Sequence, residues 1–181
     1  MAQKDTFSFN HERLVHSFAA ADRADHADHG HNMERACVTT IPTYGFNVEK
    51  ITVQGLELSL WDIGGNWHLR CGLWHHYAED TVGIICIVDS TDDEQIEEAK
   101  TRLWRIYDEQ EVKLAGTMLL VFANKQDCLN ALSVAEVKER LELETRAGEG
   151  RRWRIQGSVA TTGDGLLEGM EWMATQLKDA M

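Results

Sequence analysis

The chain has little of several features that would place it in a special class. Its four cysteines are far apart and form no Cys-x-x-Cys pair, which favours free thiols in a reducing compartment over a disulfide framework. No apolar run approaches the ~20 residues that cross a membrane, and no apolar signal-peptide stretch follows Met1. Basic residues number 18 against 30 acidic ones, for a net charge of −12, too few for a general nucleic-acid-binding surface. These absences predict a cytoplasmic protein that does not bind nucleic acid.

What remains is the composition of one globular domain. The 181 residues are 43% apolar, enough for a full core. Two apolar-rich stretches flank a Gln54-Gly55 turn and predict a hairpin. Two later runs lack polar alternation, as strands covered on both faces of a parallel sheet do. The predicted strands are residues 46–53, 56–62, 82–88, 117–123 and, more weakly, 153–158.

Helical patterns fill the gaps between these strands. Residues 91–94 (Thr-Asp-Asp-Glu) predict a capping box before a helix, and a shorter helix is expected over residues 133–143. An apolar stripe marks a C-terminal helix and consists of Leu166, Met170, Met173 and Leu177. The alternation predicts a doubly wound α/β domain with a mostly parallel sheet, helices on both faces, and ligands bound beyond the carboxyl ends of the strands.

The first 35 residues differ in kind from the rest. They hold five of the eight histidines, and residues 19–28 are almost entirely Ala, Asp, Arg and His. Residues 25–31 contain types that bind metals, but without cysteine or a defined scaffold the composition favours a solvated tract. We therefore divide the chain into an atypical, partly disordered segment over residues 1–35 and an α/β domain over residues 36–181.

The sequence Asn124-Lys125-Gln126-Asp127 follows a buried-looking strand and is typical of guanine recognition. An Asp carboxylate can accept from both the ring N–H and the exocyclic amine of guanine, and adenine lacks that amine. The Lys stem would pack over the base, and the Asn would tie the loop to the phosphate side.

A second motif, residues 61–65 (Trp-Asp-Ile-Gly-Gly), ends the hairpin. In nucleotide switches an Asp at this point holds Mg²⁺ through water, and a glycine N–H meets the γ-phosphate. The alternative is a strand followed by a flexible Gly-Gly turn. Upstream, Thr43 offers a hydroxyl that could complete the Mg²⁺ shell.

Six ordered motifs resemble the ADP-ribosylation factor (Arf) family of small GTPases. They are residues 40–49, 61–65, 73–77, 88–90, 121–127 and 160–166. The resemblance implies a six-stranded small-GTPase fold and a GTP/GDP switch with Mg²⁺, acting in vesicle-mediated transport at Golgi membranes. The expected nucleotide-binding residues are Gly65, Asn124, Lys125, Gln126, Asp127 and Ala160, and the expected Mg²⁺ ligands are Thr43 and Asp62.

Three positions depart from the family pattern. The phosphate loop Gly-x-x-x-x-Gly-Lys-[Ser/Thr] is absent, because residues 19–26, where counting back from Thr43 places it, read Ala-Ala-Ala-Asp-Arg-Ala-Asp-His. That loop converges backbone N–H groups and a Lys on the phosphates, so we expect GTP binding to be impaired. Asn66 replaces the water-positioning Gln with a shorter side chain, which impairs hydrolysis; we assign no catalytic residue. Ala2 replaces the myristoylated glycine, so we expect peripheral membrane contact without that lipid.

The aromatic residues Phe46, Trp61 and Tyr77 match the positions through which Arf proteins meet their effectors; alternatively they are half-buried sheet residues. Two functions remain open. One is a slow guanine-nucleotide switch, monomeric, that recruits effector, coat or tether proteins and uses exchange factors. The other is a nucleotide-free, Arf-shaped interaction module. An error in the assigned 5′ end of the gene would also leave the motifs after residue 38 intact.

The family topology places the first strand at the centre of the sheet, between residues 56–62 and 82–89. Residues 13–18 (Arg-Leu-Val-His-Ser-Phe) have the most apolar character near the N-terminus, so we expect them there. His16 and Ser17 would then be buried polar groups. We therefore expect a poorly seated central strand, or disorder over residues 19–32, and a domain of reduced stability.

Overall fold

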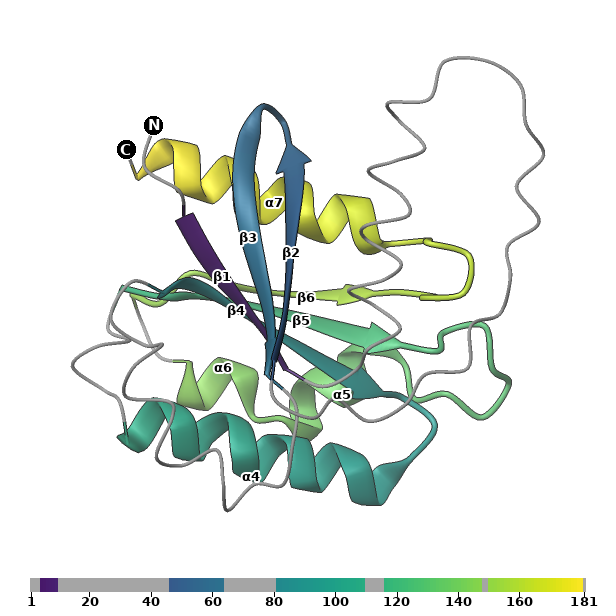
Figure 1. Ribbon diagram of the computed structural model, residues 1–181. Coiled ribbons are helices and arrows are strands. Elements are labelled where there is room, and N and C mark those ends of the chain that lie inside the picture. Colours follow the sequence, from purple (N-terminus) through teal and green to yellow (C-terminus); the bar gives the residue numbers. More distant parts are fainter. Residues whose placement is uncertain (1–3, 10–45, 64–80, 110–115, 148–149, 181) are drawn as a thin grey trace, which may run out of the picture.

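The computed structural model describes residues 4–9, 46–63, 81–109, 116–147 and 150–180. They form a six-stranded sheet in the order β2-β3-β1-β4-β5-β6, with helices on both faces (Figure 1). The elements are β1 (Lys4–Phe9), β2 (Phe46–Val53), β3 (Leu56–Ile63), β4 (Thr81–Asp89), α4 (Asp93–Glu109), β5 (Met118–Asn124), α5 (Val134–Arg140), α6 (Leu143–Arg146), β6 (Trp153–Gly157) and α7 (Leu166–Asp179). Strands β2 and β3 are antiparallel, and the other pairs are parallel. The predicted doubly wound α/β fold is therefore confirmed.

The predicted hairpin is present with a two-residue turn. Gln54 and Gly55 both have positive φ, at 50° and 77°, as the twist of a tight hairpin requires. Along β3, Leu58 and Leu60 are fully buried and Glu57 is exposed, but Ser59 is buried as well, at 1% exposure. The predicted alternation, with one face buried, therefore holds only at the start of this strand.

The core has two layers, one on each face of the sheet (Figure 1). On one face, residues of β4 and β5 pack against α4, α5 and α6, and the indole Nε1 of Trp104 donates to the carbonyl of Leu141 at 2.8 Å. On the other face, α7 buries the four residues of its predicted stripe. Strands β4 and β5 lack polar alternation because both of their faces are covered.

The N-termini of α4 and α5 are each capped by side-chain hydrogen bonds to the first turn of the helix. Helix α4 is capped by Asp92, whose Oδ1 accepts from the backbone N–H groups of Glu94 and Gln95 at 3.1 Å. The predicted capping box with Thr91 as the cap is therefore wrong by one residue. Helix α5 has a complete capping box between Ser133 and Glu136. The predicted helix over residues 133–143 ends early, and α6 follows after a left-handed residue.

The central strand is Lys4–Phe9, which pairs in parallel with β3 on one side and β4 on the other. The prediction that residues 13–18 supply this strand is wrong. Residues 13–18 have more consecutive apolar residues, whereas β1 alternates Phe7 and Phe9 with Thr6 and Ser8, and aromatic and β-branched residues suit a strand. Residues 13–18 and 19–32 lie outside the described residues. No helix that the structure describes has the length and apolar character to cross a membrane.

Candidate functional site

Three polar loops meet where β4, β5 and β6 end. Backbone hydrogen bonds join them: the N–H of Ser90 donates to the carbonyl of Asn124 at 3.1 Å, and the N–H of Gln126 donates to the carbonyl of Ser158 at 3.2 Å. Because the carboxyl ends of parallel strands lie at one end of the sheet, this is where a doubly wound fold binds ligands.

Asn124 connects the loop after β5 to the loop after β6. Its buried Oδ1 accepts from the backbone N–H of Ala160 at 3.0 Å and from the hydroxyl of Ser158 at 3.4 Å. An amide oxygen suits this position because it is a neutral acceptor, and burying it with its partners present avoids the cost of an unsatisfied group. Asn124 therefore fixes the position of Ala160 relative to residues 124–127.

Lys125 has a left-handed backbone, with φ of 65°, and its ammonium group forms an ion pair with Asp89 at the end of β4. Asp89 also accepts from the N–H and the hydroxyl of Thr91, at 3.0 and 2.7 Å. Burial by itself would raise the pKa of Asp89, but the hydrogen bonds from Lys125 and Thr91 outweigh it and hold that pKa below its usual value. The sequence pattern did not assign this role to Asp89, although its place at a strand end beside β5 could have suggested it.

The side chains of Gln126 and Asp127 have different roles. The Nε2 of Gln126 donates to the hydroxyl of Ser90 and to the carbonyl of Leu132, both at 3.0 Å, so this side chain holds the loop in place. Asp127 is exposed, and in the described part of the chain its carboxylate forms no hydrogen bond or ion pair. That carboxylate is thus free to accept two parallel N–H donors from a ligand.

The loop after β6 requires glycine at its end. Gly165 has φ of 77°, and a Cβ there would lie 2.0 Å from the carbonyl oxygen of Gly157. The loop is closed by a bridge between Val159 and Asp164 and by the hydroxyl of Thr162, which donates to Asp164 at 2.6 Å. This close packing places the backbone of Ala160 beside Asn124.

Only residues 61–63 of the second predicted motif (residues 61–65) are among those that the structure describes. Asp62 is buried, at 4% exposure, and it lies next to Ser8 in the parallel pairing of β3 with β1. The backbone of Asp62 therefore lies beside the carboxyl-terminal end of β1. Thr43, Gly65, Asn66 and Tyr77 lie outside the described residues. Among the residues described, no group of three or more His, Cys, Asp or Glu side chains forms a metal site.

The loop that follows the first strand is where this fold carries its phosphate-binding sequence. β1 ends at Phe9, and residues 19–26, where the sequence analysis places that sequence, lie outside the described residues. There is no glycine before Gly30 and no lysine between Lys4 and Lys50, so no Gly-x-x-x-x-Gly-Lys sequence follows β1.

An exposed apolar patch lies on the hairpin at the opposite edge of the sheet. Phe46 is 52% exposed and Val48 39%. The ring of Phe46 lies 5.2 Å from that of Trp61, centroid to centroid, and Val48 is the cross-strand partner of Trp61. Two of the three predicted effector residues thus lie side by side and partly exposed.

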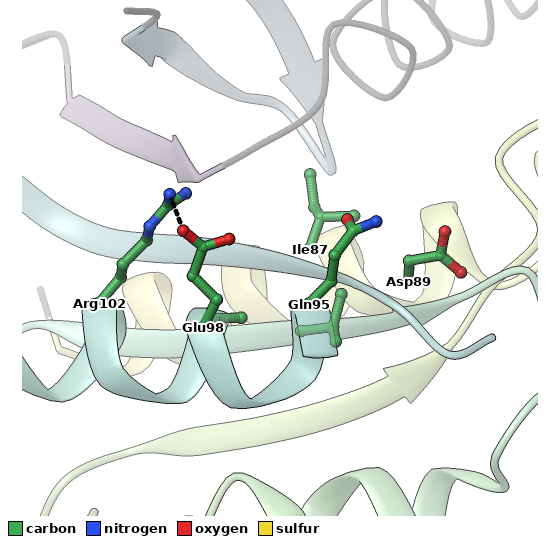
Figure 2. Close-up of a pocket in the computed structure, with 7 residues that line it drawn as sticks. Ile87, Asp89, Gln95, Glu98 and Arg102 are labelled. Atoms are coloured by element: carbon green, nitrogen blue, oxygen red, sulfur yellow. Dashed lines mark hydrogen bonds and ion pairs between the residues drawn. The ribbon is translucent and has the colours of Figure 1, made fainter. Parts of the chain in front are cut away.

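A small pocket between β4 and α4 lies beside Asp89 (Figure 2). Its volume is about 20 Å³, which is room for about one water molecule, and it is lined by Ile87, Val88, Asp89, Gln95, Glu98, Ala99 and Arg102. The pocket is too small for a nucleotide, so it is not the ligand site that the three loops form.

Comparisons with known proteins bear on this arrangement. The sequence model of the ADP-ribosylation factor family matches residues 31–177. Among solved structures, the chain is similar to the Arl6 BBS3 small GTPase from Trypanosoma brucei with bound nucleotide analogue GppNp, at 23% identity and a TM-score of 0.76, over 98% of this chain and 99% of that chain. The structural similarity supports the small-GTPase fold. The family match begins after the segment in which the phosphate-binding sequence is missing.

Proposed function

The chain belongs to the ADP-ribosylation factor family. From this premise we propose that it is a guanine-nucleotide switch protein of vesicle traffic that recognises the guanine base but binds the phosphates of the nucleotide weakly. The fold and the family support a GTP-binding switch in general terms. The proposed combination of a complete base-binding motif with a missing phosphate-loop sequence follows from this chain's own residues.

One observation carries the proposal: three residues of the loop 124–127 are held by contacts with neighbouring loops, while the carboxylate of Asp127 is exposed. Asn124, Lys125 and Gln126 are each fixed by a hydrogen bond or ion pair to a neighbouring loop. Asp127 has no such partner among the described residues and can accept the ring N–H and the amine of guanine. The backbone of Ala160, held by Asn124, would contact the base from the other loop.

The phosphates of a bound nucleotide would lack the hydrogen bonds that a phosphate loop supplies. The lysine of a phosphate loop and the converging N–H groups of its glycines make several charge-assisted hydrogen bonds, each worth about 1.5–3 kcal/mol. Losing two of them weakens binding by a factor on the order of 10² to 10⁴. Asp62, buried at the end of β3, would hold Mg²⁺ through water together with Thr43. With Asn66 in place of glutamine, hydrolysis would be slow.

Partners would bind the apolar patch of the hairpin. Phe46, Val48 and Trp61 form a surface of the kind that effector, coat or tether proteins bury, because exposed aromatic residues anchor interfaces. Exchange factors and a peripheral place at Golgi membranes are part of the same proposal.

A second candidate function is a nucleotide-free interaction module. The absence of any lysine between β1 and β2 favours it, and the exposed patch would serve it equally. The two candidates differ in whether guanine is recognised at all.

Titration of guanosine and adenosine against the purified protein tests the proposal. We expect guanosine to bind more tightly than adenosine, and Asp127→Ala to abolish the difference. Asp179→Ala is a matched control, because Asp179 is an exposed carboxylate at the end of α7 that forms no ion pair within the described part of the chain. Equal binding of the two nucleosides by the parent protein would refute base recognition and leave the interaction module.

A further inference from the structure

Two arginines, Arg151 and Arg152, directly precede β6, and Arg154 lies within it. Within the described part of the chain, Arg151, Arg152 and Arg154 form no ion pair, whereas Arg140 and Arg146 each pair with carboxylates. Residues 150–163 include no Asp or Glu, although the chain has a net charge of −12. The segment over residues 150–163 therefore carries only positive charges on an acidic protein.

Each of these arginines is held in place by a single contact. The guanidinium carbon of Arg151 lies 4.0 Å from the ring centroid of Tyr107. Arg152 donates to the carbonyl of Gln176 in α7 at 2.7 Å, and Arg154 donates to the side chain of Gln156 at 2.9 Å. A guanidinium has five N–H donors, so Arg152 and Arg154 keep most of theirs for a ligand.

The strand beside them is the last of the sheet. β6 pairs with β5 alone among the described strands, and α5 and α7 pack against it. The carbonyl of Arg152 accepts from β5, and the N–H of Ser158 donates to β5. Since alternate residues of a strand direct their backbone groups to the same side, the N–H and C=O groups of Trp153 and Ile155 point outward.

The side chains of β6 also alternate between two faces. Trp153 and Ile155 pack against the core layer of α4 to α6 and stay partly exposed. Arg152 reaches α7, so the even-numbered residues lie on the α7 face. Side chains opposite each other on neighbouring strands share a face. An added strand would therefore place one set of alternate residues beside arginines and the other beside Trp153 and Ile155.

We propose that the outer edge of β6 binds an acidic peptide of a partner protein as an additional strand. The peptide would alternate acidic residues, opposite Arg152 and Arg154, with apolar residues opposite Trp153 and Ile155. A second copy of this chain does not fit, because pairing two such edges would oppose like charges. The site is separate from the three loops that would bind nucleotide, so it does not depend on the proposed switch.

The length of the site is limited at one end. The carbonyl of Gly157 accepts from the side chain of Gln156 at 3.2 Å and is packed under Gly165. The peptide would thus pair mainly with Trp153 and Ile155, and side-chain charge would supply much of its specificity.

The test is fluorescence anisotropy with two labelled eight-residue peptides titrated with the full chain at low salt. One alternates Glu and Val, and the other has the same composition with all Glu first. We expect the alternating peptide to bind at least about fivefold more tightly. Arg154→Glu should weaken its binding roughly three- to tenfold, whereas Lys138→Glu, an exposed charge on α5, should change it less than about twofold.

N-methylation of the alternating peptide separates strand addition from charge attraction. Methylating one set of alternate amides should abolish binding, and methylating the other set should leave it intact, since only one set faces β6. Equal binding of the alternating and the Glu-first peptide, equal effects of the two methylated sets, or an unchanged affinity in Arg154→Glu would overturn the proposal. So would binding of this surface to phosphatidylserine vesicles without binding of either peptide.

Discussion

Replacing Asn124 by alanine removes the side chain that joins the loop after β5 to the loop after β6. The buried Oδ1 accepts from the N–H of Ala160 at 3.0 Å and from the hydroxyl of Ser158 at 3.4 Å. The first bond matters more, because a backbone N–H that loses its acceptor in a buried place costs about 1–3 kcal/mol. The second is long, and a hydroxyl can rotate to another partner. We therefore expect Asn124→Ala to lower the free energy of unfolding by about 1–3 kcal/mol.

Urea unfolding followed by tryptophan fluorescence would measure this change. For a chain of this size the same loss lowers the melting temperature by roughly 2–12 °C. Asn130→Ala is the control, because Asn130 is an exposed asparagine in the next turn, and we expect it to change stability by less than about 0.5 kcal/mol. Hydrogen exchange should locate the effect, with the amide of Ala160 losing protection. Equal unfolding midpoints for the two variants would refute the reasoning.

Three further predictions concern the glycine turn, pH and the apolar patch. Gly165→Ala should destabilise the domain far more than Gly163→Ala, since both have positive φ but only the first would place a Cβ against a carbonyl oxygen; similar urea midpoints would contradict this. The lowered pKa of Asp89 contributes stability that is present above the unfolded value of about 3.9 and is lost as pH falls through the folded value. Asp89→Asn should therefore flatten the acid limb of the stability curve, and an unchanged limb would count against the ion pair with Lys125. Phe46→Ala should leave the melting temperature within about 2 °C of the parent, because the side chain is half exposed, and a larger fall would show that the patch is structural.

Much of the fold could be predicted from periodicity. The runs without polar residues became β4 and β5, which are covered on both faces, and the stripe of α7 is buried as its spacing indicates. The first strand could not be predicted from apolar runs, because the residues of Lys4–Phe9 alternate between polar and apolar and the flanking residues are polar. Only the sheet, with partners on both sides, selects that segment.

The candidate site could be predicted in part from its motif. Residues 124–127 and Ala160 lie where strand ends should place them. The contacts that hold the loop were not predictable, because Asp89 and Ser90 are distant in sequence from Lys125 and Gln126, and nothing in their own spacing marks them as partners of these residues. In this site, the sequence thus predicts the residues of the loop 124–127 more readily than the residues in neighbouring loops that fix its position.

The measurement that tests the central claim most directly is the ratio of GDP to guanosine affinity in the presence of Mg²⁺, determined by calorimetry on the purified chain. Without a phosphate-loop lysine the two phosphates add little, so we predict that GDP binds within about tenfold of guanosine and that Asp127→Ala abolishes both. A preference for GDP of about a thousandfold or more corresponds to at least about 4 kcal/mol from the phosphates. That result, or stoichiometric GDP released when the purified protein is denatured, would contradict the account.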